Sequence, residues 1–317
     1  MNTVFDFYRS PITKSKLLKQ DDKLIDNELN LFPIINNIPR FVPIDNYSSS
    51  FGFQWNIFNK TQIDIQNNSN ISKIRFYKST KWKKDDLLGK KVLEVGSGSG
   101  RFTQIILETG ADLYSFDYSS AVEANQKNNS FYNNLNLSQA SIYEMPFDSN
   151  LFDFVCCLGV IQHTPNVELS FSCMVDVLKP GGQITIDVYA MNFKTIFHTK
   201  YWVRPLTKRI NKIKLLNFIK WYVPKWLPIS NLLIKVPFIG KFLAQIIPVV
   251  NFSQQFPMLN KEQQLEWSIL DTFDMLSPEY DNPQSISTLK KWILKYNLEE
   301  IYCGKGDNGY VLIAKKK

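Results

Sequence analysis

Three glycines alternate with serines at positions 96, 98 and 100, directly after a short apolar stretch at residues 91–95. The aliphatic residues of that stretch suit a buried parallel strand. Glycines allow a tight turn and a close approach of the backbone to a ligand, and a helix that follows presents unpaired N–H groups to an anion or a hydroxyl. An acid stands two residues before the first glycine. This combination predicts a loop that holds a nucleotide cofactor, with candidate contacts Glu94, Gly96, Ser97, Gly98 and Gly100.

A second acid, Asp117, ends the next predicted strand at residues 112–117, 23 residues after Glu94. At this distance a carboxylate can accept hydrogen bonds from both hydroxyls of a ribose. The alternative is that Asp117 caps a helix that begins near Ser119, and the two roles are compatible. Tyr118 is expected either to lie against an adenine ring or to pack in the core.

The glycine spacing separates two kinds of cofactor. A dinucleotide loop needs Gly-x-Gly-x-x-Gly, which would place a glycine where this chain has Arg101. The pattern Glu-x-Gly-x-Gly-x-Gly instead resembles that of class I S-adenosylmethionine-dependent methyltransferases of the bacterial small-molecule type. The resemblance continues through residues 139–147, 151–155 and 159–166, in the order that this family shows. It implies S-adenosylmethionine as the cofactor.

The resemblance also assigns binding residues further along the chain. Ser141 stands where the family usually has an aspartate that accepts from the adenine amino group, and a serine hydroxyl supplies one such bond without a charge. The fourth predicted strand ends at Leu158 and Gly159, where the methyl group is expected because ligands of open α/β sheets lie beyond the carboxyl ends of the strands. The predicted cofactor contacts beyond the glycine loop are Asp117, Tyr118, Ser141, Ile142, Leu158 and Gly159.

The family's chemistry is an in-line displacement at a sulfonium, so the protein mainly has to align the acceptor with the methyl group. His163 is the candidate general base for an acceptor that must lose a proton, because its ordinary pKa of about 6.5 suits neutral pH. Alternatively, this histidine only caps the turn or shapes the pocket. Asp271, Asp274 and Tyr280 are candidates for the acceptor pocket and not for metal ligands.

Strands and helices alternate along the chain, which predicts an α/β fold. We expect a Rossmann-like, doubly wound, seven-stranded and mostly parallel sheet with a β-rich N-terminal extension and a helical insertion before the last strands. The predicted divisions are a ribbon-like segment (1–45), a linker or cofactor-covering helical segment (46–85), the methyltransferase core (86–190), a basic aromatic helical lid (191–283) and the C-terminal part of the core (284–317).

The first 45 residues resemble the small zinc ribbon that precedes some bacterial methyltransferases, without its metal ligands. Ser10 and Thr13 stand where that segment carries a Cys-Pro-x-Cys pair, and the first cysteine of the chain is Cys156. A cysteine-ligated zinc is therefore excluded, and no metal site is assigned. In the next segment, the aromatics at residues 76–82 are expected either to cover the cofactor or to pack in the core.

The positive charge of the chain is concentrated in the predicted lid. The 317 residues include 37 Lys or Arg and 29 Asp or Glu, a net charge of +8. No acid occurs between Val188 and Asn260, so the rest of the chain is slightly acidic. The 11 basic residues of this stretch, interspersed with aromatic ones, are Lys194, Lys200, Arg204, Lys208, Arg209, Lys212, Lys214, Lys220, Lys225, Lys235 and Lys241.

Three interpretations of residues 191–260 remain open. Basic and aromatic residues suit a lid that faces an anionic membrane or an anionic acceptor, either phosphorylated or lipid-linked. They also suit a helical lid whose lysines are merely solvated and, least well, a nucleic-acid backbone. The most apolar run, residues 226–250, includes two lysines and three prolines, which argues against a membrane span and leaves at most a peripheral contact.

Together these features predict a methyltransferase that acts on an oxygen or nitrogen atom of a small acceptor. The alternatives are a non-catalytic S-adenosylmethionine-binding regulatory module and a nucleic-acid methyltransferase, although the chain has no Asn-Pro-Pro-Tyr-type motif. Four cysteines without a Cys-x-x-Cys pair predict a cytoplasmic protein, or under the membrane interpretation one at the inner face of the membrane. His198 is expected to be structural, and the acceptor and the oligomeric state do not follow from the sequence.

Overall fold

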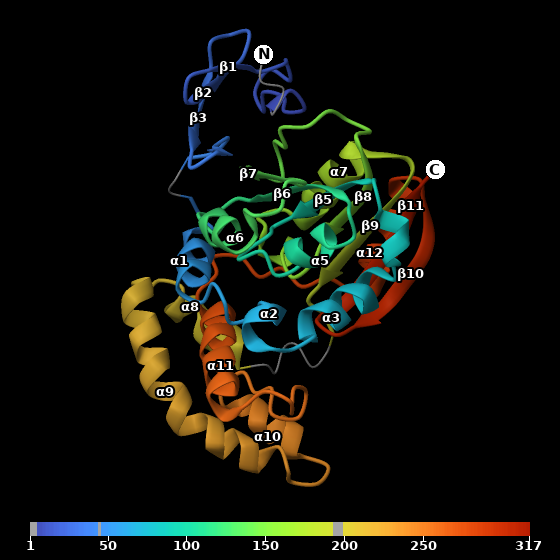
Figure 1. Cartoon of the computed structure of the whole chain (residues 1–317). Coiled ribbons are helices and arrows are strands. Elements are labelled where there is room, and N and C mark those ends of the chain that lie inside the picture. The colour runs from blue at the N-terminus through green and yellow to red at the C-terminus, as the bar shows by residue number, and fades with distance from the viewer. Residues whose placement is uncertain (1–4, 44–45, 193–198) are drawn as a thin grey trace.

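The computed structural model describes residues 5–43, 46–192 and 199–317, and its centre is a seven-stranded sheet (Figure 1). Its strands are β5 (Lys91–Val95), β6 (Asp112–Asp117), β7 (Leu135–Gln139), β8 (Phe152–Cys157), β9 (Leu178–Val188), β10 (Leu298–Gly306) and β11 (Gly309–Lys316). Their order is β10-β11-β9-β8-β5-β6-β7. All neighbours from β9 to β7 are parallel, whereas β11 is antiparallel to β9 and β10. The predicted mostly parallel, Rossmann-like sheet is confirmed.

Helices cover both faces of this sheet. They are α3 (Ile71–Thr80), α5 (Thr103–Leu107), α6 (Val122–Asn129), α7 (Val167–Val177) and α12 (Ile286–Lys295). Leu93 of β5 packs in one cluster with Phe171 of α7, whereas its neighbour Val92 packs in another with Ile106 of α5. Successive side chains of a strand point to opposite faces, so adjacent aliphatic residues bury both faces. The loops at the strand ends therefore stand on a rigid double-sided core.

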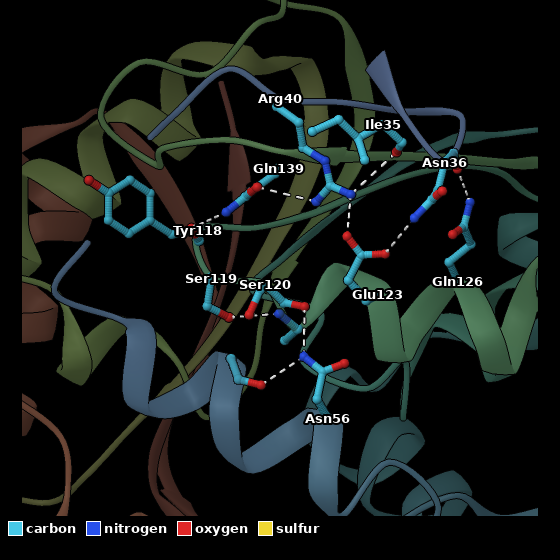
Figure 2. Close-up of polar contacts among 12 residues, drawn as sticks. Ile35, Asn36, Arg40, Asn56, Tyr118, Ser119, Ser120, Glu123, Gln126 and Gln139 are labelled. Carbon is cyan, nitrogen blue, oxygen red and sulfur yellow. Dashed lines mark hydrogen bonds and ion pairs between the residues drawn. The ribbon is translucent and has the colours of Figure 1, made fainter. Parts of the chain in front are cut away.

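The N-terminal extension is a separate four-stranded antiparallel sheet. Its strands are β1 (Leu18–Gln20), β2 (Lys23–Ile25), β3 (Leu31–Ile35) and β4 (Ile38–Pro39). Figure 2 shows how it is attached to the central sheet: the guanidinium of Arg40 donates to Gln139 Oε1 on β7 (3.2 Å) and pairs with Glu123 of α6. Because Arg40 is buried, these partners are needed to offset its desolvation.

A hydrogen-bond network occupies the part of this extension where the zinc-ribbon resemblance has lost its cysteines. The carboxylate of Asp26 accepts from Ser10 Oγ at 2.7 Å and from Thr13 Oγ1 at 3.1 Å, the two positions of the missing pair. Asn30 adds a third side-chain donor at 2.9 Å. Within the described residues no group of three or more His, Cys, Asp or Glu side chains is placed to hold a metal ion. This part of the extension is thus held together by hydrogen bonds between a carboxylate and hydroxyl groups.

Residues 46–85 form helices at the carboxyl edge of the sheet, namely α1 (Ser49–Ile57), α2 (Asp64–Asn67), α3 and α4 (Lys84–Leu87). Asn56 of α1 donates to the carbonyl of Ser120, just beyond β6 (2.9 Å; Figure 2). Of the two roles expected for the aromatics at 76–82, core packing is observed for Phe76 and Trp82, because both are buried against α5 and β8. The charged side chain of α3 that reaches the cavity described below is Arg75, and Phe51 and Trp55 of α1 also line it.

The stretch before α12 contains the accessory helices α8 (Lys200–Thr207), α9 (Lys212–Leu233), α10 (Gly240–Ile246) and α11 (Lys261–Leu276). In Figure 1 the long α9 lies outermost and α11 lies between it and the body of the protein. Ile219 and Val223 of α9 are buried with Phe273 of α11. No helix of the described residues is long and apolar enough to cross a membrane. Lys194 and His198 lie outside the described residues.

Candidate active site

A cavity of about 380 Å³ opens at the carboxyl ends of the central strands. Its walls come from the glycine loop after β5, the end of β6, the turn after β8 and the end of β9, and it is closed by side chains of α1, α3 and α11. This is the position at which open α/β sheets bind ligands, and the volume lies within the range of small-molecule sites.

The glycine loop has the backbone conformation that its composition predicts. Gly96, Gly98 and Gly100 have φ angles of 77°, 53° and 86°, a region that favours glycine. A Cβ on Gly96 would lie 2.5 Å from Val160, and one on Gly98 would lie 3.1 Å from the indole nitrogen of Trp55. Gly96, Ser97 and Gly98 line the cavity, whereas Gly100 lies against Asn125 and Asn129 of α6 and does not.

Asp117 connects the end of β6 to the glycine loop. One carboxylate oxygen accepts from the backbone N–H of Gly98 at 2.9 Å, and the other accepts from the N–H and the hydroxyl of Ser119 at 2.8 and 2.6 Å. It does not cap α6, whose N-cap residue is Ala121. Burial raises the pKa of Asp117 above its ordinary value, although these hydrogen bonds favour the charged form. The carboxylate lines the cavity, and three of its roughly four acceptor sites are occupied, which leaves one on the oxygen that binds Gly98.

Glu94 lies behind the loop and does not line the cavity. Its side chain is 3% exposed, and one carboxylate oxygen accepts from Thr103 Oγ1 of α5 and from Ser115 Oγ of β6 (2.7 Å). The other oxygen is buried without a hydrogen-bond partner. Burial is the main reason that the pKa of Glu94 is raised to about 7. This carboxyl therefore joins β5, β6 and α5 beneath the glycine loop.

Of the remaining predicted cofactor contacts, four line the cavity and one does not. Tyr118, Ile142, Leu158 and Gly159 line the cavity. Ser141 does not, and its hydroxyl accepts from the backbone N–H of Tyr143 at 3.2 Å. Contact with a cofactor remains a prediction for each of these residues.

His163 ends the short 3₁₀ helix η2 (Ile161–His163) and faces the same cavity. Its Nδ1 lies 2.9 Å from the carbonyl oxygen of Tyr280. Because a carbonyl only accepts, this contact assigns the proton to Nδ1 and leaves Nε2 with a lone pair. Nε2 is buried and has no partner. Burial lowers the pKa of His163, although Asp274 and Asp281 oppose that shift, so the ring is neutral at pH 7.

The sequence did not single out two charged residues that shape this site. Arg75 of α3 lines the cavity, and its guanidinium pairs with Asp187 near the end of β9 at 2.9 Å. Asp187 is 1% exposed and also accepts from the backbone N–H of Gly159. A sequence signal for Asp187 existed, because it is the only acid of β9 and, like Asp117, stands close to the carboxyl end of a strand. No local pattern marked Arg75.

Comparison with known proteins agrees with this geometry. Residues 93–186 match the model of a family described as "Methyltransferase domain". The chain contains a class I S-adenosylmethionine-dependent methyltransferase domain. The matched residues include the glycine loop, Asp117 and His163, and the cofactor of this domain is S-adenosylmethionine.

Two relatives, which are named for different methyl acceptors, match only part of this chain. Over 115 residues the chain is 28% identical to the ubiquinone biosynthesis O-methyltransferase of Coxiella burnetii, which covers 36% of this chain and 49% of that protein. Over 111 residues it is 31% identical to phosphoethanolamine N-methyltransferase 2 of Caenorhabditis elegans, which covers 33% of this chain and 25% of that protein. The chain thus spans about half the length of the O-methyltransferase and less of the other.

Among the solved structures similar to this chain is a putative S-adenosyl-L-methionine-dependent methyltransferase from Methanococcus maripaludis. The alignment covers 87% of this chain and 96% of the chain in that structure. The TM-score is 0.46 and the sequence identity is 12%.

The cavity of the methyltransferase domain fits a polar ligand such as S-adenosylmethionine. Four polar side-chain atoms of its lining residues are buried without a hydrogen-bond partner in the protein. Buried polar groups are rarely left unpaired, so these atoms favour a ligand with both donors and acceptors. They are Ser97 Oγ, Ser99 Oγ, Arg75 Nε and His163 Nε2.

One wall of the cavity is formed by α11 and carries two carboxylates. Asp271 and Asp274 lie three residues apart and both line the cavity, as the sequence suggested for an acceptor pocket. Asp271 accepts from Gln62 Nε2 (3.1 Å) and Asp274 from Gln54 Nε2 (3.2 Å). Burial is the main reason that the pKa of Asp271 is raised to about 7, and the neighbouring Asp274 raises it further. This wall of the cavity is rich in hydrogen-bond acceptors.

Proposed function

We propose that this protein transfers a methyl group from S-adenosylmethionine to an oxygen or nitrogen atom of a small-molecule acceptor. The observation that carries the proposal is the unpartnered, unprotonated Nε2 of His163 in the same cavity as the glycine loop and Asp117. When bound, the cofactor supplies an electrophilic methyl group on a sulfonium.

Each part of the cavity has a role in holding this cofactor. Asp117 would accept from the ribose hydroxyls, because its carboxylate is already oriented by Gly98 and Ser119. Tyr118 and Ile142 would contact the adenine. The guanidinium of Arg75 would bind the methionine carboxylate, since its Nε has no partner in the protein and Asp187 fixes its direction.

His163 would accept the proton that the acceptor loses. The Tyr280 carbonyl holds the ring in one tautomer, and the lowered pKa keeps Nε2 unprotonated at neutral pH. Alignment of the acceptor by the cavity walls can contribute on the order of 7–11 kcal/mol, so the base need supply only part of the rate.

For the acceptor, the proposal favours a lipid-linked molecule over a phosphorylated one. A phosphate against α11 would meet Asp274 and the partly ionised Asp271, and like charges in a buried site repel. Hydroxyl or amino groups would instead donate to these carboxylates. A lipid-linked acceptor also agrees with the exposed basic and aromatic residues of 191–260, for which peripheral contact with an anionic membrane is proposed. The two relatives named above act on chemically different acceptors, so they do not decide this point.

The proposal is tested by incubating the purified protein with S-adenosylmethionine labelled in the methyl group and with bacterial extract separated into organic and aqueous fractions. Label in a small molecule of the organic fraction is expected, and a His163→Asn variant should transfer much less. Cofactor binding without transfer to any fraction would favour a regulatory module. Label recovered in RNA or DNA would favour the nucleic-acid alternative.

A further inference from the structure

The solvent side of α9 and the turn between α9 and α10 carry a continuous series of exposed apolar and basic side chains. Along α9 they recur every three or four residues and so share one face, opposite the face buried against α11. Beyond α9 the turn adds Val236, Phe238 and Ile239, and α10 adds Phe242 and Ile246. We call this set the α9–α10 surface, and its members on α9 are Lys214, Phe218, Trp221, Lys225, Ile229 and Leu232.

The described cations of residues 191–260 include two groups that the sequence could not separate. Lys200 and Arg204 pair with the buried Asp281, and Lys208 pairs with Glu279 at 2.8 Å. These three hold α8 against the segment after α11. By contrast, Lys214, Lys220, Lys225 and Lys235 are exposed and form no ion pair with any described residue. Of these four, Lys214 and Lys225 belong to the α9–α10 surface, and Lys220 and Lys235 adjoin members or turn residues of that surface in the chain.

Two aromatic rings of this surface, Phe218 and Trp221, continue into a series of ring contacts with Tyr222 and Trp226 along α9. Phe218 lies 5.9 Å from Trp221 and 5.5 Å from Tyr222, and Tyr222 lies 5.7 Å from Trp226. The ammonium of Lys225 lies 3.8 Å from the ring centre of Trp221. Trp, Tyr and Lys in contact are typical of the layer where lipid headgroups meet acyl chains.

The turn between α9 and α10 is exposed to solvent. Phe238 is completely exposed and has a φ of 63°, a conformation that is uncommon for a bulky residue. Leu232, Val236 and Ile239 beside it are also exposed. Figure 1 places this turn at the end of the molecule opposite the N-terminal sheet, so a flat surface can approach it without obstruction.

Three kinds of partner could cover such a surface, and their chemistry separates them. A second copy of the same face would place lysines against lysines without any acid to pair them. A nucleic acid would use the lysines and stack on the rings, but it would leave Ile229, Leu232 and Ile239 in water. An anionic bilayer uses all of these groups at once, because its headgroups pair with the lysines and its acyl boundary takes up the aliphatic side chains.

We propose that the α9–α10 surface docks peripherally on an anionic lipid bilayer, with Phe238 and its neighbours at the acyl boundary and the lysines of α9 against the headgroups. The interaction does not involve the cavity of the methyltransferase domain. Vesicle binding is measured without any methyl acceptor, so its failure would leave the proposed methyl transfer untouched and would remove only the support that membrane contact gives to a lipid-linked acceptor.

The test is co-sedimentation of the full-length protein with vesicles of phosphatidylcholine alone and with vesicles in which about a third of the lipid is phosphatidylglycerol. We expect binding to the anionic vesicles only, weakened by added salt. The triple variant K214E/K220E/K225E should lower the partition coefficient about tenfold or more. The double variant L232S/F238S should lower it as well, because it removes apolar insertion without changing the charge.

Matched controls change the same residue types elsewhere on the surface. K84E/K290E/K291E alters three exposed lysines, and F131S/L294S alters two exposed apolar residues; both should bind vesicles like the unmodified protein. Equal recovery of the unmodified protein in the supernatant with both vesicle types would overturn the proposal. So would equal losses in the controls and in the α9 variants. Retention of single-stranded RNA on filters, lost in K214E/K220E/K225E, without vesicle binding would identify a nucleic-acid surface instead.

Discussion

The guanidinium of Arg75 on α3 lies 2.9 Å from the carboxylate of Asp187 near the end of β9, and this ion pair joins two segments 112 residues apart in the chain. Asp187 also accepts from the backbone N–H of Gly159, so one buried carboxylate orients both the cation and the turn after β8. The cavity thereby gains a directed positive charge close to the glycine loop. That arrangement leads to the first prediction.

Replacing Arg75 with Gln should weaken binding of S-adenosylhomocysteine by about 10- to 100-fold, because a charge-assisted hydrogen bond to its carboxylate is lost. Binding of 5′-methylthioadenosine, which lacks that carboxylate, should change little. Isothermal titration calorimetry measures both affinities, and the exposed Arg209→Gln is the matched control. Equal losses for the two ligands would show that Arg75 does not hold the carboxylate.

Asp117→Ala should weaken cofactor binding more than Ser141→Ala. Asp117 lines the cavity and holds the N–H of Gly98, so its removal loses the ribose acceptor and loosens the loop, at a cost of about 10- to 100-fold in affinity. Ser141 bonds only to the backbone of its own turn, and its loss should cost at most about fivefold. The same calorimetric titration ranks the two variants, and the reverse order would mean that the ribose lies elsewhere.

His163→Asn should lower kcat by about 10²- to 10⁴-fold with little change in cofactor affinity. Because burial lowers the pKa of His163, the acid limb of the unmodified enzyme's kcat/KM profile should lie below the ordinary histidine pKa of about 6.5. Activity is then lost as the pH falls through that lowered pKa, and the limb should disappear in the variant. An unchanged profile, with the limb retained, would reduce His163 to a residue that shapes the pocket.

Glu94→Gln should change the pH dependence of stability. The pKa of Glu94 is raised from 4.5 to about 7 in the folded state, so its carboxyl stabilises the fold fully below pH 4.5 and this stabilisation is lost as the pH rises through about 7. Glutamine does not titrate. Between pH 4.5 and about 7, the free energy of unfolding of the variant should therefore rise by about 3 kcal/mol relative to that of the unmodified protein. Urea unfolding at a series of pH values measures the difference, and a constant difference would contradict the raised pKa.

The core of the site could be predicted from the sequence because its parts are local. The glycine loop, the acid that ends β6 and the histidine turn each consist of a few consecutive residues. Parallel strands bring their carboxyl ends to one edge of the sheet, so motifs at successive strand ends converge without any knowledge of packing. Sequence reasoning therefore predicted the sheet, the domain family and the neighbourhood of Asp117 and His163.

Side-chain direction within these motifs was not predictable in the same way. Glu94 belongs to the glycine motif, yet its carboxyl lies beneath the loop and binds Thr103 and Ser115. Ser141 turns toward its own backbone while the adjacent Ile142 lines the cavity. A residue's place in a pattern sets its position along the chain, whereas the pleat and the neighbouring helix decide which space it faces.

The sequence by itself determined the fold class, the cofactor and the concentration of positive charge between Val188 and Asn260. Only the tertiary structure decided that Arg75 and Asp271 line the same cavity. It also decided which lysines pair with Asp281 and Glu279 and which remain on the outer face of α9. The physical reason is that composition and short motifs act through local backbone geometry. Contacts between distant segments depend on how whole helices pack, and no local pattern encodes that packing.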